Sequence, residues 1–369
     1  MFTHYYPWQE NGWKRLARMR DRLPHALLLH GRPGIGKLHF AQAFAQALLC
    51  EDRRPDGLAC GTCPACGWFA SGNHPDFRQI QPEALSLVEA AAEPAEETED
   101  GKKKQPSKQI KIDQIRALSD FLNLGAHRGG SRIVLIHPAE SMNASTANAL
   151  LKSLEEPSAG VVFLLVTHQA SRLLATVRSR CHALAMSVPP RASSLRWLQE
   201  QGRSAPAATL AFSGDAPLEA ALLQEDEVGT RHKLFGFLSQ SASSLSLAEF
   251  CQRLPPGPVA AWMLKWTYDL IAVASAGEVR YNIGYEKQLL RLALAMPKLK
   301  LLRFYSALLG MKAISEHPLN ARLFFDDLFT AYREVGVSMN NVRRSFPPKT
   351  RSSGRSGTVM VSITFPAGL

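Results

Sequence analysis

A glycine-rich turn between a short apolar run and an amphipathic segment is the feature that most constrains the fold of this chain. Residues 26–29 are Ala-Leu-Leu-Leu and predict a buried strand, while residues 38–49 repeat large apolar side chains at four-residue spacing and predict a helix. Between them, residues 31–37 read GRPGIGK. This fits the GxxxxGK phosphate-binding loop, whose backbone N–H groups and lysine ammonium hold phosphates. The candidate nucleotide-binding residues are Gly31, Gly34, Gly36 and Lys37.

Two substitutions argue against ATP hydrolysis at this site. Leu38 stands where the pattern needs a Ser or Thr hydroxyl to hold Mg²⁺. The predicted strand 133–136 runs into His137-Pro138-Ala139-Glu140, where a working ATPase has an acidic pair. Glu140 comes too late for that role, and we expect it to cap a helix over 141–156. Two alternatives remain for the loop: weak binding of a phosphate or a nucleotide, or a turn that only closes the fold.

Strand and helix patterns alternate over the first half of the chain. Strands that alternate with helices form a parallel sheet covered on both faces. We therefore expect an α/β, doubly wound P-loop domain over residues 1–187. The segments that predict strands are 26–29, 77–80, 133–136, 161–166 and 182–186.

The remainder of the chain has helical patterns. Residues 188–227 predict a small helical domain, and residues 228–337 predict a larger one. Residues 338–369 are basic and rich in Ser, Pro and Gly, and we expect a flexible tail. Residues 83–109 carry many charges and few large apolar side chains. They predict a disordered surface insertion, because such a segment cannot bury enough apolar area to offset its ordering entropy.

Four of the six cysteines lie within residues 50–66 and include two CxxC steps. Four thiolates fill a tetrahedral Zn²⁺ shell and leave no position for a reacting water, which predicts a structural zinc site. The alternatives are a redox CxxC pair and an iron–sulfur cluster. The candidate metal ligands are Cys50, Cys60, Cys63 and Cys66. We expect Cys181 and Cys251 to be small buried apolar residues.

The formal net charge is +11, from 43 Lys plus Arg and 32 Asp plus Glu. This favours nucleic acid as a partner only weakly, because much of the charge falls in the basic tail. No apolar run approaches the roughly 20 residues that span a bilayer, and the first ten residues have no signal-peptide core. We expect a cytoplasmic protein with no membrane partner.

The order of the motifs resembles that of one family. Besides the loop and the four cysteines, the chain contains His74-Pro75-Asp76, the sequence NALLKSLEEP at 148–157, and Ser179-Arg180-Cys181. Together they resemble the bacterial sliding-clamp loaders, AAA+ proteins of the DNA polymerase III holoenzyme, and the resemblance extends over residues 1–335. It implies an AAA+ domain, a small helical lid and a helical collar for oligomerisation. The substitutions in the loop resemble the family's non-catalytic stator subunit. The alternative is the ATP-hydrolysing gamma/tau motor.

The resemblance also implies roles for single residues. Arg180 matches the arginine finger that completes the ATP site of the adjacent subunit in trans. Thr167 matches a sensor that faces the phosphates, and a strand-end hydroxyl bound to backbone is its alternative. A sensor arginine is expected near residues 212–217, where the sequence has none. Glu155 and Glu156 stand at a predicted helix end, where negative charge is unfavourable, and this indicates an interface.

The implied partners are the gamma/tau ATPase and delta subunits of the loader. The sliding clamp and primed DNA are reached through the complex. On this hypothesis the chain is not an enzyme by itself but a subunit of a DNA polymerase holoenzyme. A zinc-dependent nucleic-acid-binding module is the rival class, because it would also suit the net charge and the cysteines.

Overall fold

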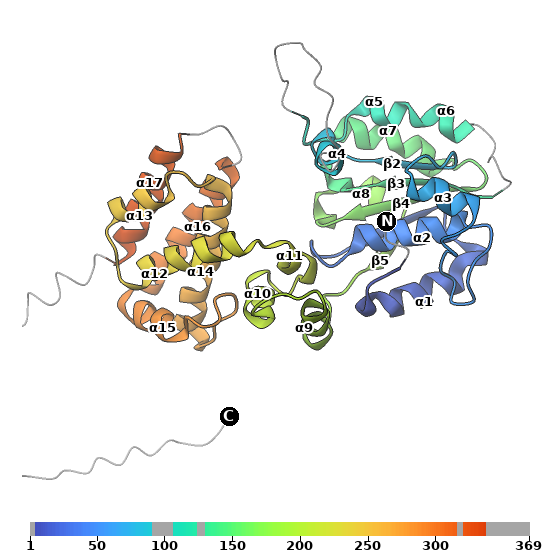
Figure 1. The fold of residues 1–369 in the computed structure, drawn as a ribbon. Helices are drawn as coiled ribbons and strands as arrows, with labels where there is room; N and C mark the ends of the chain where they lie inside the picture. Colours follow the sequence, from blue (N-terminus) through green and yellow to red (C-terminus); the bar gives the residue numbers. More distant parts are fainter. Residues whose placement is uncertain (1–3, 91–105, 124–129, 316–319, 337–369) are drawn as a thin grey trace, which may run out of the picture. The chain divides into compact units, whose positions relative to one another are not determined.

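The computed structural model of the protein describes residues 4–90, 106–123, 130–315 and 320–336 (Figure 1). Backbone contacts divide the chain into two compact units. Unit 1 contains the residues up to His232 together with 279–284, and unit 2 contains 233–278 and the residues from Tyr285 onward. Each unit buries its own set of apolar side chains.

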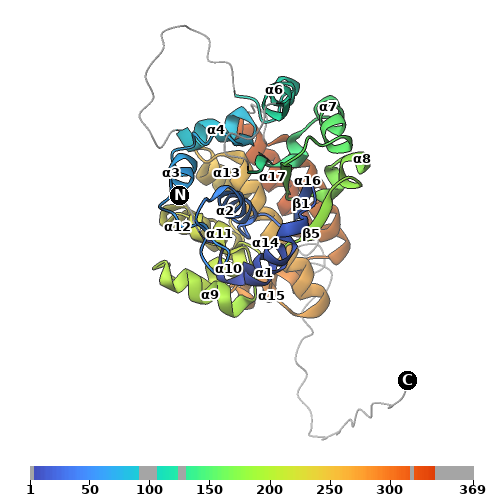
Figure 2. The same ribbon diagram turned by 90° about the vertical axis from the view of Figure 1, so that its right-hand side faces the viewer.

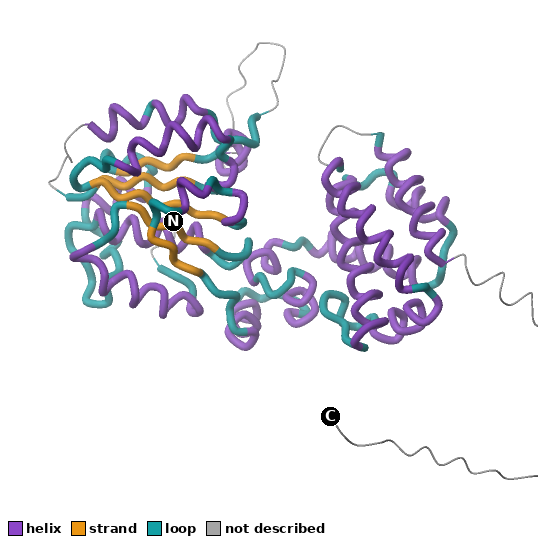
Figure 3. The backbone as a smooth tube through the Cα atoms, turned by 180° about the vertical axis from the view of Figure 1, so that it is seen from behind, coloured by secondary structure: helices purple, strands orange, loops and turns teal. Residues whose placement is uncertain are grey.

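Unit 1 is built on a five-stranded parallel sheet (Figure 3). The strand order is β2-β3-β4-β1-β5, and every neighbouring pair is parallel. Strands β3 and β4 are buried along their whole length, as expected for strands covered on both faces. The strands are β1 (Ala26–His30), β2 (Phe77–Ile80), β3 (Arg132–Ile136), β4 (Val161–Thr167) and β5 (His182–Ala185).

Helices cover both faces of the sheet, because successive side chains of a strand point to opposite sides. Leu27 and Leu29 of β1 enter one core with α1, α2 and α3, whereas Leu28 enters the other core with α5, α6, α7 and α8. Figure 1 shows α5, α6 and α7 on one side of the sheet and α1 and α2 on the other, and in Figure 2 α6 and α7 lie above β1 while α1 lies below it. These helices are α1 (Glu10–Met19), α2 (Lys37–Leu49), α3 (Pro64–Ala70), α5 (Ile112–Arg116), α6 (Leu118–Asn123), α7 (Ala144–Glu155) and α8 (Ala175–Arg178).

Three short helices follow β5 in unit 1. They are α9 (Arg191–Glu200), α10 (Pro206–Phe212) and α11 (Pro217–Leu222). Leu198, Leu210 and Ala220 form their common core, one residue from each helix. Helix α12 (Glu225–Ser239) then leads from unit 1 into unit 2.

Unit 2 is helical throughout its described residues. Trp266 is fully buried at its centre, stacks on Phe235 with ring centroids 4.8 Å apart, and donates its indole N–H to the hydroxyl of Tyr332 at 3.1 Å. The helices that follow α12 are α13 (Ser244–Cys251), α14 (Pro256–Ala276), α15 (Glu286–Ala295), α16 (Lys298–Ile314) and α17 (Ala321–Gly336).

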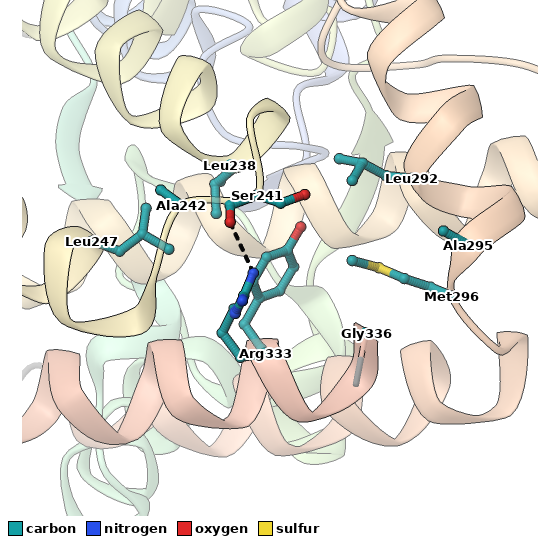
Figure 4. A pocket seen from close by; sticks show the side chains of 10 residues that line it. Leu238, Ser241, Ala242, Leu247, Leu292, Ala295, Met296, Arg333 and Gly336 are labelled. Atoms are coloured by element: carbon teal, nitrogen blue, oxygen red, sulfur yellow. Dashed lines mark hydrogen bonds between the residues drawn. The ribbon is translucent and has the colours of Figure 1, made fainter. Parts of the chain in front are cut away.

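A cavity of about 280 Å³ opens in unit 2 beside the end of α17 (Figure 4). Leu247, Leu292 and Met296 make much of its wall apolar, and Arg333 closes one side by donating to the carbonyl oxygen of Ser241 at 3.0 Å. All the predicted site residues lie in unit 1, so this cavity is not part of the predicted site.

The α/β fold class and the five predicted strands are confirmed. The helix expected over 141–156 begins later, at Ala144, because the side chain of Asn143 accepts the N–H of Thr146 and caps the helix there. A helix is also present inside the insertion that we expected to be disordered.

That insertion was predicted wrongly at its start, since α4 spans Glu83–Ala90. Its composition of Glu, Ala and Leu favours helix, and Glu83 is held by the N–H of Ser107 and by the ammonium of Lys111. Residues 91–105 of the insertion and the tail 338–369 lie outside the described residues. Across the parts of the chain that are described, no helix has both the length and the apolarity needed to cross a membrane.

Leu164→Ala is expected to lower the free energy of unfolding of unit 1 by about 2–5 kcal/mol, because it leaves a cavity in the middle of β4 where Leu164 is 0% exposed. Leu222→Ala is the matched control: this leucine is 73% exposed, and the change should stay within about 0.5 kcal/mol. Urea unfolding followed by circular dichroism measures both. Equal costs for the two variants would contradict the assignment of β4 to the core.

Candidate functional site

The glycine loop joins β1 to α2 at the carboxyl edge of the sheet. Gly34 and Gly36 have positive φ angles of 70° and 87°, and Gly36 is the N-cap of α2. Side chains would be strained at both positions and would also collide with neighbours. The loop therefore has the strand–turn–helix geometry that its sequence predicts.

Lys37 is bonded to its own loop. Its ammonium donates to the carbonyl oxygen of Gly31 at 2.8 Å and to that of Arg32, and the residue is 2% exposed. Burial lowers the pKa of Lys37 to about 8, and attraction to Glu140 and Glu219 partly opposes that shift. Carbonyl oxygens thus occupy two of the three N–H donors with which the ammonium would bind a phosphate.

Helix α11 covers the loop from one side. The N–H of Leu218 donates to the carbonyl oxygen of Gly34 at 3.0 Å. A Cβ built on Gly34 would lie 2.7 Å from Cγ of Glu219 and 2.9 Å from Cβ of Ala216, so these residues touch the loop backbone. Two residues beyond the segment where the family resemblance implies an arginine, α11 brings the carboxylate of Glu219 near enough to attract the ammonium of Lys37.

The N-terminal segment covers the loop from another side. Gln9 donates its amide to the carbonyl oxygens of Ile35 and Gly36 at 3.0 and 2.9 Å, and the indole of Trp8 donates to Ile35 at 3.0 Å. The ring of Tyr6 lies against Gly36, stacks on Trp8, and meets the ring of Trp197 edge-on. Protein side chains therefore cover the end of the loop at Ile35 and Gly36, which are buried, whereas Arg32 and Pro33 are exposed.

Two histidines and one carboxylate lie at the ends of β3 and β4. The His137 and His168 rings are 5.3 Å apart and nearly perpendicular, and Glu140 accepts the backbone N–H of His168 at 2.9 Å. Burial lowers the pKa of His137 to about 4, with further repulsion from His168 and Lys37, so its imidazole is neutral at pH 7. Burial likewise lowers the pKa of His168.

Glu140 was expected to cap the following helix, and that expectation is wrong. Asn143 makes the cap, and Glu140 ties the end of β3 to the end of β4. Thr167, the predicted sensor, is 0% exposed, and its hydroxyl accepts the N–H of Gln169 at 3.2 Å. The position expected to hold Mg²⁺ thus has the imidazole of His137 and one carboxylate, Glu140, whose Oε1 is bonded to backbone while its Oε2 is buried without a hydrogen-bond partner among the described residues.

The four clustered cysteines meet at one point. Their Sγ atoms all lie within 4.8 Å of one another, with separations of 3.6 Å for Cys50–Cys60, 3.8 Å for Cys50–Cys63 and 4.0 Å for Cys60–Cys66. Four sulfurs at Zn–S distances of about 2.3 Å in a tetrahedron are about 3.8 Å apart, so the spacing fits zinc.

Backbone N–H groups stabilise the thiolate form of Cys60, whereas burial raises the pKa of the Cys50 and Cys66 thiols. Cys60 accepts from the N–H of Thr62 at 3.4 Å and of Cys63 at 3.3 Å, and these bonds lower the pKa of its thiol to about 6. Cys63 accepts the N–H of Cys66 at the start of α3. The same turn therefore supplies both ligands and donors, as a metal-binding turn does.

Arg180 follows α8 and forms an ion pair. Its Nη2 lies 2.6 Å from Oε1 of Glu155, while its Nη1 donates to the carbonyl oxygen of Thr176 at 3.0 Å and contacts the hydroxyl of Ser179 at 3.4 Å. The Arg180 side chain is 34% exposed. The sequence singled out Arg180 and Glu155 separately, and only the structure joins them.

The sequence analysis missed several contacts at the loop. Nothing in its patterns indicated that Tyr6 and Gln9 would lie against the loop, because they precede it by more than 20 residues and match no motif. Glu219 matches no motif either, and its approach to Lys37 depends on how α11 packs on the loop. His168 could have been found, since it directly follows the sensor position Thr167 in sequence.

The parallel sheet and the glycine loop between β1 and α2 define a P-loop α/β protein. A family model described as "DNA polymerase III, delta subunit" matches residues 8–190. DNA polymerase III subunit delta' of Pseudomonas aeruginosa is 37% identical over 297 residues, which cover 78% of this chain and 81% of that protein. DNA polymerase III subunit delta' of Escherichia coli K12 is 33% identical over 247 residues, which cover 65% of this chain and 67% of that protein. The chain belongs to the family of DNA polymerase III delta' subunits.

The similarity to a solved structure is lower in sequence identity. A DNA polymerase III gamma subunit-related protein from Thermotoga maritima aligns over 88% of this chain and 99% of its own, at 19% identity and a TM-score of 0.40.

Cys60→Ser is expected to abolish stoichiometric zinc binding, because it removes one of four thiolates from a closed shell. Cys251→Ala, which changes a cysteine of α13 outside the cluster, should leave the zinc content unchanged. Zinc is measured by mass spectrometry of the metal released from the purified proteins. Retention of full zinc by Cys60→Ser would contradict the four-cysteine site.

His137 predicts a pH-dependent stability. An unfolded histidine takes up a proton below its ordinary pKa of 6.5, whereas the folded one does so only near 4, so stability falls as the pH drops through this window. His137→Asn is expected to remove about 1–2 kcal/mol of the loss between about pH 7.5 and about pH 5. Urea unfolding at the two pH values tests this. Identical pH dependence in variant and wild type would contradict it.

Proposed function

We propose that the protein is a non-catalytic clamp-loader subunit that supplies Arg180 in trans to the ATP site of a neighbouring motor subunit. In this proposal it is a stator: it hydrolyses no ATP itself, and the assembled complex loads the sliding clamp onto primed DNA during replication. Its membership of the delta' family supports the role in the clamp loader. Two observations support the role of Arg180 in trans. Lys37 of the chain's own loop is bonded to loop carbonyls, and the guanidinium of Arg180 is partly exposed.

The ammonium of Lys37, bonded to Gly31 and Arg32, is the observation that carries the proposal of a site without catalysis. ATP binding would have to break these bonds, displace α11 from Gly34 and bring phosphates close to Glu140 and Glu219. Hydrolysis would also need oxygen ligands for Mg²⁺, and neither the Leu38 side chain nor the His137 imidazole supplies an oxygen. These obstacles favour a stator over the gamma/tau-like motor.

Arg180 is suited to act outside its own chain. Its side chain is 34% exposed and presents a planar, positively charged fork of N–H donors that matches phosphate oxygens. A guanidinium placed against a transferring phosphoryl group neutralises charge that develops in the transition state. The chain thus has a group for phosphoryl chemistry but no competent site of its own to use it in.

The remaining assignments belong to the same proposal. The partners are the gamma/tau ATPase and delta subunits, and the location is the cytoplasm. The zinc ion is structural and fixes the turn that connects α2 to α3. We propose an AAA+ domain over 1–187, a lid over 188–227 and a collar over 228–337, which assembles with other subunits, followed by a basic tail over 338–369.

Arg180→Ala is expected to leave zinc content and unfolding free energy nearly unchanged but to slow ATP hydrolysis at the neighbouring site. An arginine finger contributes about 10³- to 10⁵-fold to the rate at the site that it serves, so a loss of at least about 10²-fold there is expected. Single-turnover hydrolysis by the reconstituted loader with clamp and primed DNA measures it. Arg172→Ala is the control, because Arg172 is an exposed arginine and lies between β4 and α8, shortly before Arg180. An unchanged rate in Arg180→Ala would refute the proposal.

A further inference from the structure

We infer that Glu155 is a positioning residue that holds Arg180 in the orientation needed at the neighbouring ATP site. The inference rests on the proposed function, since it concerns how the same arginine works. It starts from the contact between Nη2 of Arg180 and Oε1 of Glu155 at 2.6 Å. No sequence motif predicts this pairing, because the two residues belong to separate motifs.

Three acceptors from two elements hold the guanidinium. Glu155, at the end of α7, binds Nη2, while the carbonyl of Thr176 and the hydroxyl of Ser179 bind Nη1. A guanidinium has five N–H donors in a rigid fork, so these contacts leave donors for phosphate oxygens. A long arginine side chain that is already ordered loses less rotamer freedom when it engages a phosphate.

The stability of the fold does not account for Glu155. It is the last residue of α7, where the helix dipole disfavours a negative charge. Its side chain is 48% exposed and that of Arg180 is 34% exposed, and ion pairs this open to solvent contribute little to folding. The charge of Glu155 therefore disfavours the end of α7, and its ion pair adds little to the free energy of unfolding. The effect of Glu155 on the position of Arg180 is the better explanation for this contact.

Glu156 provides a matched comparison within the chain. It adjoins Glu155, caps the same helix through a backbone bond to Lys152, and is exposed. The ion pair of Arg180 is with Glu155 and not with Glu156. The two glutamates therefore have the same charge and nearly the same position but differ in this one contact.

The test is single-turnover ATP hydrolysis by the complete loader with clamp and primed DNA. Glu155→Gln is expected to lower the rate constant about tenfold or more, with little change in the KM for ATP, because misplacement of a charge that acts in the transition state affects kcat. Glu156→Gln leaves the ion pair between Arg180 and Glu155 in place and should slow hydrolysis less than Glu155→Gln does. Glu155→Asp should restore part of it, and Arg180→Ala combined with Glu155→Gln should be no slower than Arg180→Ala alone.

Opposite outcomes separate the possibilities. A faster rate in Glu155→Gln would mean that Glu155 restrains Arg180 and would overturn the inference, as would an unchanged rate or an equal effect of Glu156→Gln. If Arg180→Ala slows hydrolysis and Glu155→Gln does not, only the positioning role fails. If Arg180→Ala has no effect, the proposed function itself fails. Unfolding curves of each variant identify any rate loss caused by unfolding.

Discussion

The ammonium of Lys37, bonded to the carbonyls of Gly31 and Arg32, is the interaction on which the site depends. A phosphate loop must keep its lysine available to an anion. Here carbonyl oxygens of the loop bind the ammonium of Lys37, and two neighbouring segments bond to the loop backbone. Helix α11 bonds to Gly34, Gln9 bonds to Ile35 and Gly36, and burial lowers the pKa of Lys37 without neutralising it at pH 7.

The four clustered cysteines and Arg180 are likewise held in place by neighbouring hydrogen-bonding groups. Sulfurs at the spacing of a zinc shell are held by a turn whose N–H groups point at them. The guanidinium of Arg180 is held by Glu155, Thr176 and Ser179. In our proposal these features serve the assembled clamp loader. The glycine loop no longer supports ATP hydrolysis, and Arg180 is positioned to act at the ATP site of a neighbouring subunit.

Local patterns sufficed to predict the strands, the glycine loop and the cysteine cluster, because each depends on residues close in sequence. The α4 helix was missed because its composition was averaged with that of a long charged insertion. The contacts of Tyr6 and Gln9 with the loop and the pairing of Arg180 with Glu155 could not be predicted. They join residues more than 20 positions apart, and no spacing rule brings such residues together. Glu140 was misassigned because a nearby asparagine is the better cap.

A structure of the assembled loader with a transition-state analogue of ATP hydrolysis tests the central claim most directly. Our account predicts that the guanidinium of Arg180, still paired with Glu155, contacts the γ-phosphate mimic in the adjacent subunit, while Lys37 remains bonded to Gly31 and Arg32 with no nucleotide beside it. A nucleotide held by Lys37, or an Arg180 directed away from the neighbouring phosphates, would contradict it.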